Sequence, residues 1–231
     1  MSAYDGFAPI YDVWSAARTE DEEFYAALAH EADWPIVELA VGTGRVAIPL
    51  AGRTGKRIIG IDSSPAMLAV AGELAAHAGV PLELREGDMC NLSLDEPAAL
   101  VYCPFRSLLY QPTWHAGRRV FERVAASLRR GGRFAWNAFV FDPRIAVELD
   151  GKPNTIGDVA HTNVYFPADN RIEITLDDGP SVSLWWVSRS EWEALLDVAE
   201  LETEGLYGWF DRRPFDEESR EFVWVARKPS R

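Results

Sequence analysis

The sequence predicts an α/β protein built around a largely parallel sheet, and three observations lead to this prediction. Between residues 35 and 140, short apolar runs alternate with longer amphipathic segments, as strands alternate with crossover helices. Capping and turn-forming residues such as Ser64, Pro65 and Gly79 separate these segments. After Phe141 the rhythm changes to apolar runs separated by "PADN" and "DDGP", which indicates an antiparallel ribbon.

Each predicted element rests on a local pattern. Residues 15–33 are predicted to be helical because apolar residues recur at helical spacing after an acidic first turn. Residues 64–79 have a capping serine, a proline at the first helical position and a closing glycine. Residues 113–130 are amphipathic and end at Gly131 and Gly132. In full, we expect helices at 15–33, 45–51, 64–79, 113–130 and 189–201, and strands at 35–40, 57–62, 82–88, 98–105, 133–140, 204–210 and 221–228.

The ribbon, predicted at residues 159–187, is too short to own a hydrophobic core. We therefore expect one domain over residues 1–231, in which residues 152–188 form an antiparallel insertion over the ligand-binding edge of the sheet. Residues 1–33 are expected to supply an N-terminal cap segment and helix.

Composition excludes several classes of partner. The chain has 231 residues, 48% of them hydrophobic, and a formal net charge of −13. This charge disfavours nucleic acid, which needs clustered Lys and Arg, and it disfavours anionic membranes. The two cysteines, Cys90 and Cys103, do not have metal-ligand spacing, so no metal is expected and reduced thiols in the cytoplasm are favoured. We expect no leader segment in "MSAYDGFAPIYD" and no membrane span, and either a monomer or a homodimer.

The stretch "ELAVGTGRVAIPL" (38–50) carries the strongest local signal. Gly42 and Gly44 follow a predicted strand and precede a predicted helix, so the backbone here can approach a ligand closely. "GTGRVA" also satisfies the dinucleotide pattern G-x-G-x-x-G/A, with Ala47 in the last position. The loop alone therefore leaves the nucleotide cofactor undecided.

Three further segments meet this loop at the carboxyl edge of the predicted sheet, where ligands of open α/β sheets bind. Asp62 ends the second strand and can accept hydrogen bonds from a ribose diol. Asp88 in "GDM" can accept from an exocyclic amine such as that of adenine, and Met89 can cover the ring. "CPF" (103–105) supplies small and apolar groups after the fourth strand. Together these groups suit an amino acid carboxylate, a ribose and an adenine, with no demand for a pyrophosphate.

At these residues the chain resembles a class I S-adenosylmethionine-dependent methyltransferase of the small-molecule type. The resemblance covers nearly the whole length and rests on "YDGFAPIYD", "VELAVGTGRVAIPLA", "IGIDSSPAMLAVA", "GDM", "CPFRSLLY", "LRRGGRFAWNAF" and "PFDEESREFVWVARK" in this order. It implies a Rossmann-like, mostly parallel seven-stranded sheet of order 3-2-1-4-5-7-6 with its last strand antiparallel. It also implies helices on both faces of that sheet.

The resemblance further implies S-adenosylmethionine as cofactor and assigns its contacts by position. Gly42 and Gly44 would flank the methionine part, Asp62 would hold the ribose hydroxyls, and Asp88 and Met89 would bind adenine. The expected cofactor contacts are Tyr11, Glu38, Ala40, Gly42, Thr43, Gly44, Arg45, Asp62, Ser63, Met67, Asp88, Met89, Cys103, Pro104 and Phe105.

Two departures from the family pattern limit what transfers. Ala40 replaces the first glycine of the commonest family loop, and its small size is compatible with the same role. Arg106 and Tyr110 stand where many relatives carry Asn and His, so no substrate or base assignment is inherited.

Candidates for substrate contact and catalysis therefore come from the residues themselves. Tyr11, Tyr110 and His161 are candidate bases, and each could equally pack or face water. Arg106 could pair with a substrate carboxylate or phosphate, or with an acidic side chain of the protein. We predict that Trp185 or Trp186 contacts substrate, with only one of the two facing inward because strand neighbours alternate.

The sequence thus predicts methyl transfer to O or N of a small molecule, and two alternatives stay open. A dinucleotide-dependent oxidoreductase is compatible with Gly42, Gly44, Ala47 and Asp62, but it gives "GDM" and the closing strands no clear role. A non-catalytic module that binds S-adenosylmethionine is also compatible, because methyl transfer needs no signature catalytic residue.

Overall fold

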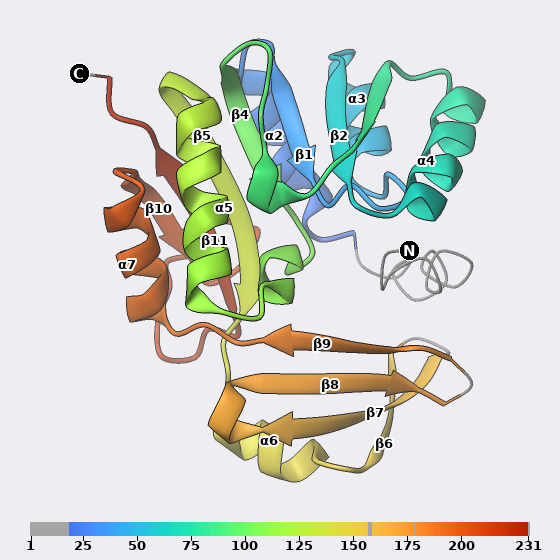
Figure 1. The fold of residues 1–231 in the computed structure, drawn as a ribbon, viewed down its shortest axis with the longest axis vertical. Coiled ribbons are helices and arrows are strands. Elements are labelled where there is room, and N and C mark those ends of the chain that lie inside the picture. The colour runs from blue at the N-terminus through green and yellow to red at the C-terminus, as the bar shows by residue number, and fades with distance from the viewer. Residues whose placement is uncertain (1–18, 157–158, 178, 231) are drawn as a thin grey trace.

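A computed structural model describes residues 19–156, 159–177 and 179–230, which form a large and a small sheet (Figure 1). The large sheet has seven strands in the order β10-β11-β5-β4-β1-β2-β3. Its strands are β1 (Ile36–Leu39), β2 (Ile58–Asp62), β3 (Leu82–Glu86), β4 (Ala98–Cys103), β5 (Leu128–Phe139), β10 (Glu202–Tyr207) and β11 (Glu221–Arg227). β1 to β5 pair in parallel, whereas β11 runs antiparallel to both β5 and β10. The predicted order 3-2-1-4-5-7-6 with an antiparallel last strand is confirmed.

Helices cover both faces of the large sheet. The helices are α2 (Glu22–Glu31), α3 (Ala47–Thr54), α4 (Pro65–Ala78), α5 (Trp114–Ser127), α6 (Pro143–Leu149) and α7 (Arg189–Val198). The apolar residues of α2 and α3 join a core cluster on one face, and those of α5 and α7 join a second cluster on the other face. As predicted, the Ser64 side chain accepts a hydrogen bond from the Met67 N–H at the start of α4, and Gly79 closes the helix with a positive φ.

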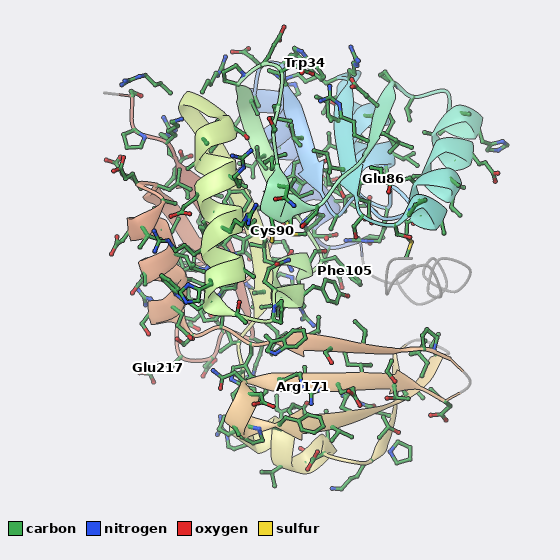
Figure 2. The ribbon with its side chains drawn as sticks, viewed as in Figure 1. Trp34, Glu86, Cys90, Phe105, Arg171 and Glu217 are labelled. Carbon is green, nitrogen blue, oxygen red and sulfur yellow. The ribbon has the colours of Figure 1, made fainter. Side chains whose placement is uncertain are left out.

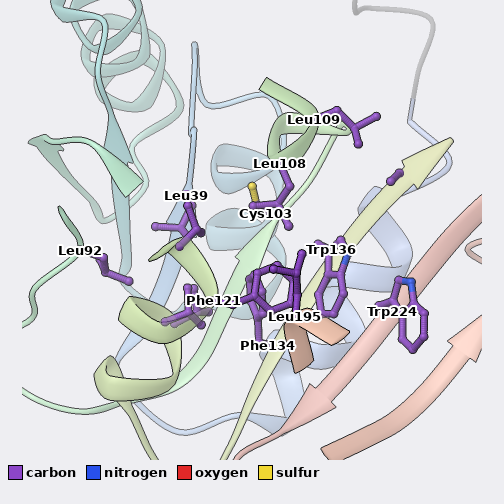
Figure 3. Packing of buried hydrophobic residues seen from close by; sticks show 14 of the residues in the cluster. Leu39, Leu92, Cys103, Leu108, Leu109, Phe121, Phe134, Trp136, Leu195 and Trp224 are labelled. Carbon is purple, nitrogen blue, oxygen red and sulfur yellow. The ribbon is translucent and has the colours of Figure 1, made fainter. Parts of the chain in front are cut away.

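The core on the α5 and α7 side is dominated by aromatic rings (Figure 3). Trp136 on β5 and Trp224 on β11 are register partners, and their rings stack with centroids 5.7 Å apart. Phe121 of α5 packs edge-on against Trp136 at 5.1 Å. Much of the chain's tryptophan content is therefore structural, because these side chains are almost fully buried.

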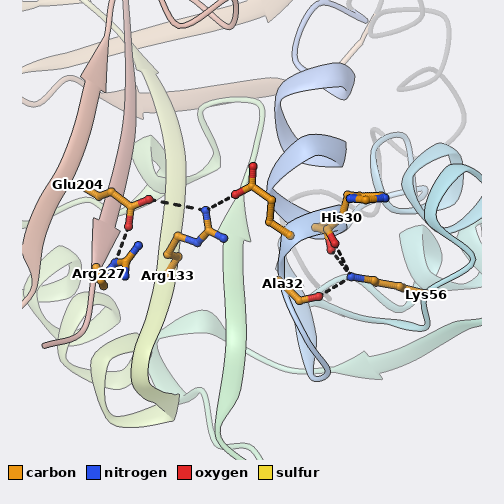
Figure 4. Close-up of polar contacts among 8 residues, drawn as sticks. His30, Ala32, Lys56, Arg133, Glu204 and Arg227 are labelled. Atoms are coloured by element: carbon orange, nitrogen blue, oxygen red, sulfur yellow. Dashed lines mark hydrogen bonds and ion pairs between the residues drawn. The ribbon is translucent and has the colours of Figure 1, made fainter. Parts of the chain in front are cut away.

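Charged side chains join α2 to the opposite ends of the sheet (Figure 4). The Lys56 ammonium donates to the carbonyl oxygens of Ala29 and His30, both at 2.8 Å, and to that of Ala32. A cation suits this position, since carbonyl groups at a helix C-terminus lack partners within the helix. On the other side, Arg133 of β5 donates to Glu31 at 2.8 Å.

The small sheet differs in extent from the predicted ribbon. It has four antiparallel strands, β6 (Pro153–Ile156), β7 (Val159–Phe166), β8 (Arg171–Leu176) and β9 (Ser181–Trp185). It lies beyond the carboxyl edge of the parallel strands, with β9 nearest to the large sheet (Figure 1). β6 and helix α6 were not predicted, although Asp142 and Pro143 supply the capping residue and first-turn proline of a helix.

Several predicted boundaries were wrong. The helix predicted at 45–51 is Ala47–Thr54, the helix predicted at 189–201 is Arg189–Val198, and the strand predicted at 204–210 is Glu202–Tyr207. The junction between α5 and β5 also differs. The helix predicted at 113–130 ends at Ser127, and β5 begins at Leu128. The reason is pairing with the chain's end: the Gly131 N–H donates to the Lys228 carbonyl, and the Lys228 N–H donates to the Gly132 carbonyl, each at 2.9 Å. The first predicted helix begins at Glu22 within the described residues, and its expected residues 15–18 lie outside them. Among the described residues, none of the helices has both the length and the apolar character needed to cross a bilayer.

Candidate active site

The loops that follow β1 and β2 are held together by one carboxylate. The Asp62 Oδ2 atom accepts from the Gly42 N–H, and Oδ1 accepts from the Ser64 N–H, both at 2.8 Å. Ionised carboxylate oxygens accept hydrogen bonds, including those from the hydroxyl groups of a ligand. Asp62 therefore organises the site and can also bind within it.

A cavity of about 180 Å³ opens beside this carboxylate. Nine predicted site residues line it: Ala40, Gly42, Asp62, Ser63, Met67, Asp88, Met89, Phe105 and Tyr110. Four lining residues were not predicted, namely Ile61, Gly87, Ser107 and Gln111. Ile61 and Gly87 directly precede predicted residues, so widening each motif by one position would have found them. Phe105 lies at the end of the large sheet that faces the small sheet (Figure 2).

The backbone of the first loop bends through the left-handed region three times. Ala40 has a φ of 53°, Gly42 of 56° and Gly44 of 86°. Glycine adopts this region freely, whereas an alanine there is strained. Ala40 thus fills the glycine position of the loop at an energetic cost, while lining the cavity.

Six predicted cofactor contacts are not among the described residues that line the cavity: Glu38, Thr43, Gly44, Arg45, Cys103 and Pro104. Cys103 is fully buried at the end of β4, and burial holds the pKa of its thiol well above the usual value. Arg45 makes a two-pronged ion pair with Asp21, and its guanidinium lies 4.6 Å from the centre of the Phe105 ring. These residues shape the cavity wall from behind. Tyr11, the remaining predicted contact, lies outside the described residues.

Glu38 is a buried acid behind the loop. It is 1% exposed, and its Oε2 atom has no hydrogen-bond partner among the described residues. Loss of hydration raises the pKa of Glu38 to about 8. Glu38 therefore holds a proton in the folded protein over a pH range in which it has lost that proton in the unfolded chain.

We expect Glu38→Gln to stabilise the protein progressively as the pH rises from about 4.5 to about 8. In that window only the folded state binds this proton, so the wild type loses stability with rising pH while the variant has no such group. The difference in free energy of unfolding, measured by urea denaturation at several pH values, should be small near pH 4.5 and reach about a few kcal/mol above pH 8. Glu217→Gln, at an exposed position, is the control. If the difference in free energy of unfolding between Glu38→Gln and the wild type does not change with pH, this account is contradicted.

Asp88 and Met89 lie at the far end of the cavity from Ala40 in the order of the strands. The Asp88 carboxylate caps a short 3-10 helix, η1 (Met89–Asn91), by accepting from the Cys90 N–H at 2.8 Å. Its other oxygen accepts from the Asn91 side chain at 3.1 Å. These bonds fix the carboxylate where it borders the cavity.

Arg106 belongs to a polar network rather than to the cavity wall. Its Nε and Nη2 atoms donate to the two carboxylate oxygens of Glu221, at 3.1 and 2.7 Å. Glu221 is 2% exposed in its side chain and also accepts from the Asn137 amide at 2.6 Å. Tyr25 donates to the same Asn137 side chain at 3.0 Å. Of the two interpretations offered for Arg106, the structure shows the ion pair with a protein carboxylate.

The candidate bases occupy different places. Tyr110 lines the cavity at the end of a second 3-10 helix, η2 (Ser107–Tyr110). His161 does not face water as one interpretation expected: it is 1% exposed within the small sheet, with its Nδ1 atom 3.4 Å from the Val159 carbonyl. It is not among the described residues that line the cavity, because the small sheet buries this strand position.

Trp185 and Trp186 line a second cavity of about 120 Å³, which we call the tryptophan pocket. Both border this one pocket, and the expectation that only one of them faces the substrate stays a prediction. β9 ends at Trp185, so strict alternation stops there, and the Trp186 N–H donates to the Asn170 carbonyl at 2.8 Å. Gln111 lines both this pocket and the first cavity.

Comparison with known proteins identifies the family. The sequence model of a methyltransferase domain matches residues 36–132, which contain both loops joined by Asp62 and the whole of "CPFRSLLY". With the strand order described above, this decides the assignment. The chain contains a class I S-adenosylmethionine-dependent methyltransferase domain. No curated protein matches the chain.

Solved structures share the methyltransferase fold. The CcbJ methyltransferase from Streptomyces caelestis is similar with a TM-score of 0.84 and 24% identity, covering 99% of this chain and 98% of that one. An S-adenosylmethionine-dependent methyltransferase from Clostridium acetobutylicum has a TM-score of 0.81 and 17% identity, covering 99% and 100%. CalS10 from Micromonospora echinaspora, an amino pentose methyltransferase, has a TM-score of 0.64 and 21% identity, covering 99% and 92%. At these identities the likeness concerns the fold.

The charge of the cavity fits S-adenosylmethionine, the cofactor of this methyltransferase family. Asp62 and Asp88 line it, and none of the described lining residues is Lys, Arg or His. S-adenosylmethionine carries a sulfonium and an ammonium against one carboxylate, so an acidic lining suits it. The pyrophosphate of a dinucleotide would instead favour cations at this place. Buried Met67 and half-buried Met89 add apolar surface of the kind that a flat base needs.

Proposed function

We propose that this methyltransferase transfers the methyl group of S-adenosylmethionine to an oxygen or nitrogen atom of a small molecule. The observation that carries the proposal is the acidic cavity organised by Asp62, in which one carboxylate accepts from both cofactor loops and borders the space where a ribose would bind. Asp88 and Met89 are proposed to hold adenine, and Gly42 to border the methionine part. The buried residues Glu38, Thr43, Cys103 and Pro104, together with the half-buried Arg45, would support this binding indirectly.

When bound, the cofactor supplies the electrophilic methyl group and the leaving group of an in-line displacement. The chain's own task is to hold the acceptor atom in line and to exclude water, which can lower a barrier by roughly 7–11 kcal/mol in favourable cases. Tyr110 is the proposed acceptor contact, since it is the candidate base that lines the cavity among the described residues. A base is needed only where the acceptor atom arrives protonated.

The class of acceptor is supported by charge and by structural neighbours. The net charge of −13 disfavours nucleic acid substrates. Two neighbours are named as an amino pentose methyltransferase and a sugar N-methyltransferase, the second being KedS8 from Streptoalloteichus. We therefore propose a small polar metabolite as acceptor, with the small sheet as the cover of its binding site. A cytoplasmic location and a monomeric or homodimeric state stay predictions.

Calorimetric titration tests the cofactor assignment against the alternatives. We expect S-adenosylmethionine and S-adenosylhomocysteine to bind, and NAD and NADH to give no heat. Asp62→Asn should weaken the binding of S-adenosylmethionine and of S-adenosylhomocysteine at least tenfold, because it removes a charged acceptor and disturbs both loops. Asp95→Asn is the control, since this side chain is exposed and does not line the cavity.

The outcomes separate three functions. Binding of NADH without binding of S-adenosylmethionine would contradict the proposal and favour an oxidoreductase. Transfer of labelled methyl groups from S-adenosylmethionine to components of a metabolite extract separates an enzyme from a non-catalytic binding module. Tight cofactor binding with no labelled product under any condition would favour the module.

A further inference from the structure

The tryptophan pocket lies between four segments of the chain. It is enclosed by residues 169–170, the end of β9, the segment from η2 into α5, and the first turns of α7. Four tryptophans line it, namely Trp114, Trp185, Trp186 and Trp192. The first cavity has no tryptophan among its described lining residues. The two cavities therefore select for different chemistry.

The aromatic walls are fixed in place. Phe141 stacks on Trp186 with centroids 3.9 Å apart and an angle of 7° between the rings. This packing holds Trp186 in one orientation and leaves it 9% exposed. Trp192 is 1% exposed, and its indole Nε1 has no hydrogen-bond partner among the described residues. Both rings are thus held by the protein, and Trp192 belongs to the buried wall of the pocket.

The charge of the tryptophan pocket has one sign. Asp169 and Glu191 line it, whereas none of the described lining residues is Lys, Arg or His. The Glu191 carboxylate is engaged in capping α7, where it accepts from the Ser188 N–H at 2.8 Å. Asp169 is exposed at the end of a short 3-10 helix, η3 (Pro167–Asp169), and no ion pair within the described part of the chain neutralises its carboxylate. Arg118 lies against Trp114 but forms an ion pair with Glu122.

Tryptophan faces beside carboxylates attract organic cations. The negative face of the indole ring attracts an ammonium group, and the attraction is stronger when water is excluded. A carboxylate at the rim adds long-range attraction. A neutral flat molecule would gain the apolar contacts alone, and an anion would meet repulsion from Asp169 and Glu191.

We propose that the tryptophan pocket binds an ammonium group carried on a flat apolar body, as a part of the methyl acceptor separate from the reacting atom. This inference rests on the proposed function. The two cavities share Gln111 on the segment that follows η2, so one molecule can reach from the first cavity into the second. A protonated amine has no lone pair and cannot accept a methyl group. The cation held by the tryptophans is therefore a recognition group, and the nucleophile is a second atom of the same acceptor.

Three small probes that differ mainly in charge test the proposal with the full chain. These are 2-phenylethylamine, 2-phenylethanol and 3-phenylpropionate, titrated by calorimetry in the presence of saturating S-adenosylhomocysteine. We expect the amine to bind at least fivefold more tightly than the alcohol, and the carboxylate to bind most weakly. Trp185→Ala should weaken the amine about tenfold. Asp169→Asn should reduce the preference for the amine, because the tryptophans and Glu191 remain, while leaving the alcohol's affinity unchanged.

Controls keep this inference separate from the proposed function. Asp197→Asn changes an exposed acid of α7 that does not line the pocket, and it should not alter any probe affinity. The affinity for S-adenosylhomocysteine should be the same in all variants, so a failure of that ligand to bind would count against the proposed function alone. Equal binding of the three probes, or an amine preference that is unchanged in both Trp185→Ala and Asp169→Asn, would overturn the inference. Competition between the amine and S-adenosylhomocysteine would also overturn it, since the probe would then occupy the first cavity.

Discussion

Replacing Gly44 with valine is expected to abolish binding of S-adenosylmethionine while leaving the protein folded. Gly44 has a φ of 86°, a conformation that costs a β-branched residue about 1–3 kcal/mol. A Cβ atom there would lie 2.7 Å from Cδ1 and 2.9 Å from Cγ1 of Ile48, in the first turn of α3. The loop must therefore shift, and with it the Gly42 N–H that donates to Asp62. Calorimetric titration with S-adenosylmethionine and circular dichroism of the variant give the two readouts.

Ala40→Gly is the matched control for this variant. Ala40 lies in the same loop with a φ of 53°, where glycine relieves strain instead of adding it. We expect this variant to bind S-adenosylmethionine at least as tightly as the wild type and to be no less stable. If Gly44→Val binds the cofactor with unchanged affinity, the loop is not the part of the site that we infer.

Local patterns predicted most of the large sheet because its elements are specified locally. The strand at 98–105 is continuously apolar, and the helix at 64–79 has a capping residue at each end. The prediction of the boundary between α5 and β5 failed for a different reason. Leu128 to Gly132 join the sheet through bonds to Lys228, about a hundred residues away, and no local pattern reports such a partner. β6 was missed because "PNTI" has too little alternation to stand out as a strand.

The residues of the candidate site also separate into those that have a local sequence signal and those that have none. Gly42, Asp62 and Asp88 were predictable, since each follows directly from the end of a predicted strand. Ser107 and Gln111 were not, because they reach the cavity through η2, which follows two residues with positive φ, Phe105 and Arg106. Non-glycine residues with positive φ carry no reliable sequence signal. The burial of His161 likewise depends on a small sheet whose packing the sequence does not reveal.

Replacing Arg106 with alanine is expected to destabilise the protein by about 3–5 kcal/mol, because the change leaves a buried carboxylate without its cation. Glu221 lies 115 positions away in the sequence, and its side chain is 2% exposed. After the substitution, the Glu221 carboxylate would keep the hydrogen bond from Asn137 but would lose both bonds from Arg106. The free energy of unfolding, measured by urea denaturation near neutral pH, is the direct readout. The exposed pair of Arg213 and Asp211 offers a matched comparison, for which Arg213→Ala should leave the free energy of unfolding nearly unchanged.

A second variant decides whether the loss comes from the unpaired charge. Glu221→Gln in the Arg106→Ala background removes the carboxylate, so it should recover a large part of the lost stability. If Arg106 served the acceptor instead, Arg106→Ala would leave the free energy of unfolding near that of the wild type, and the added Glu221→Gln would restore nothing. Because the guanidinium donates to both oxygens of Glu221, we expect the first result. Arg106, which follows β4, then stabilises the fold. Tyr110 and the tryptophan pocket are the groups that we propose to recognise the acceptor.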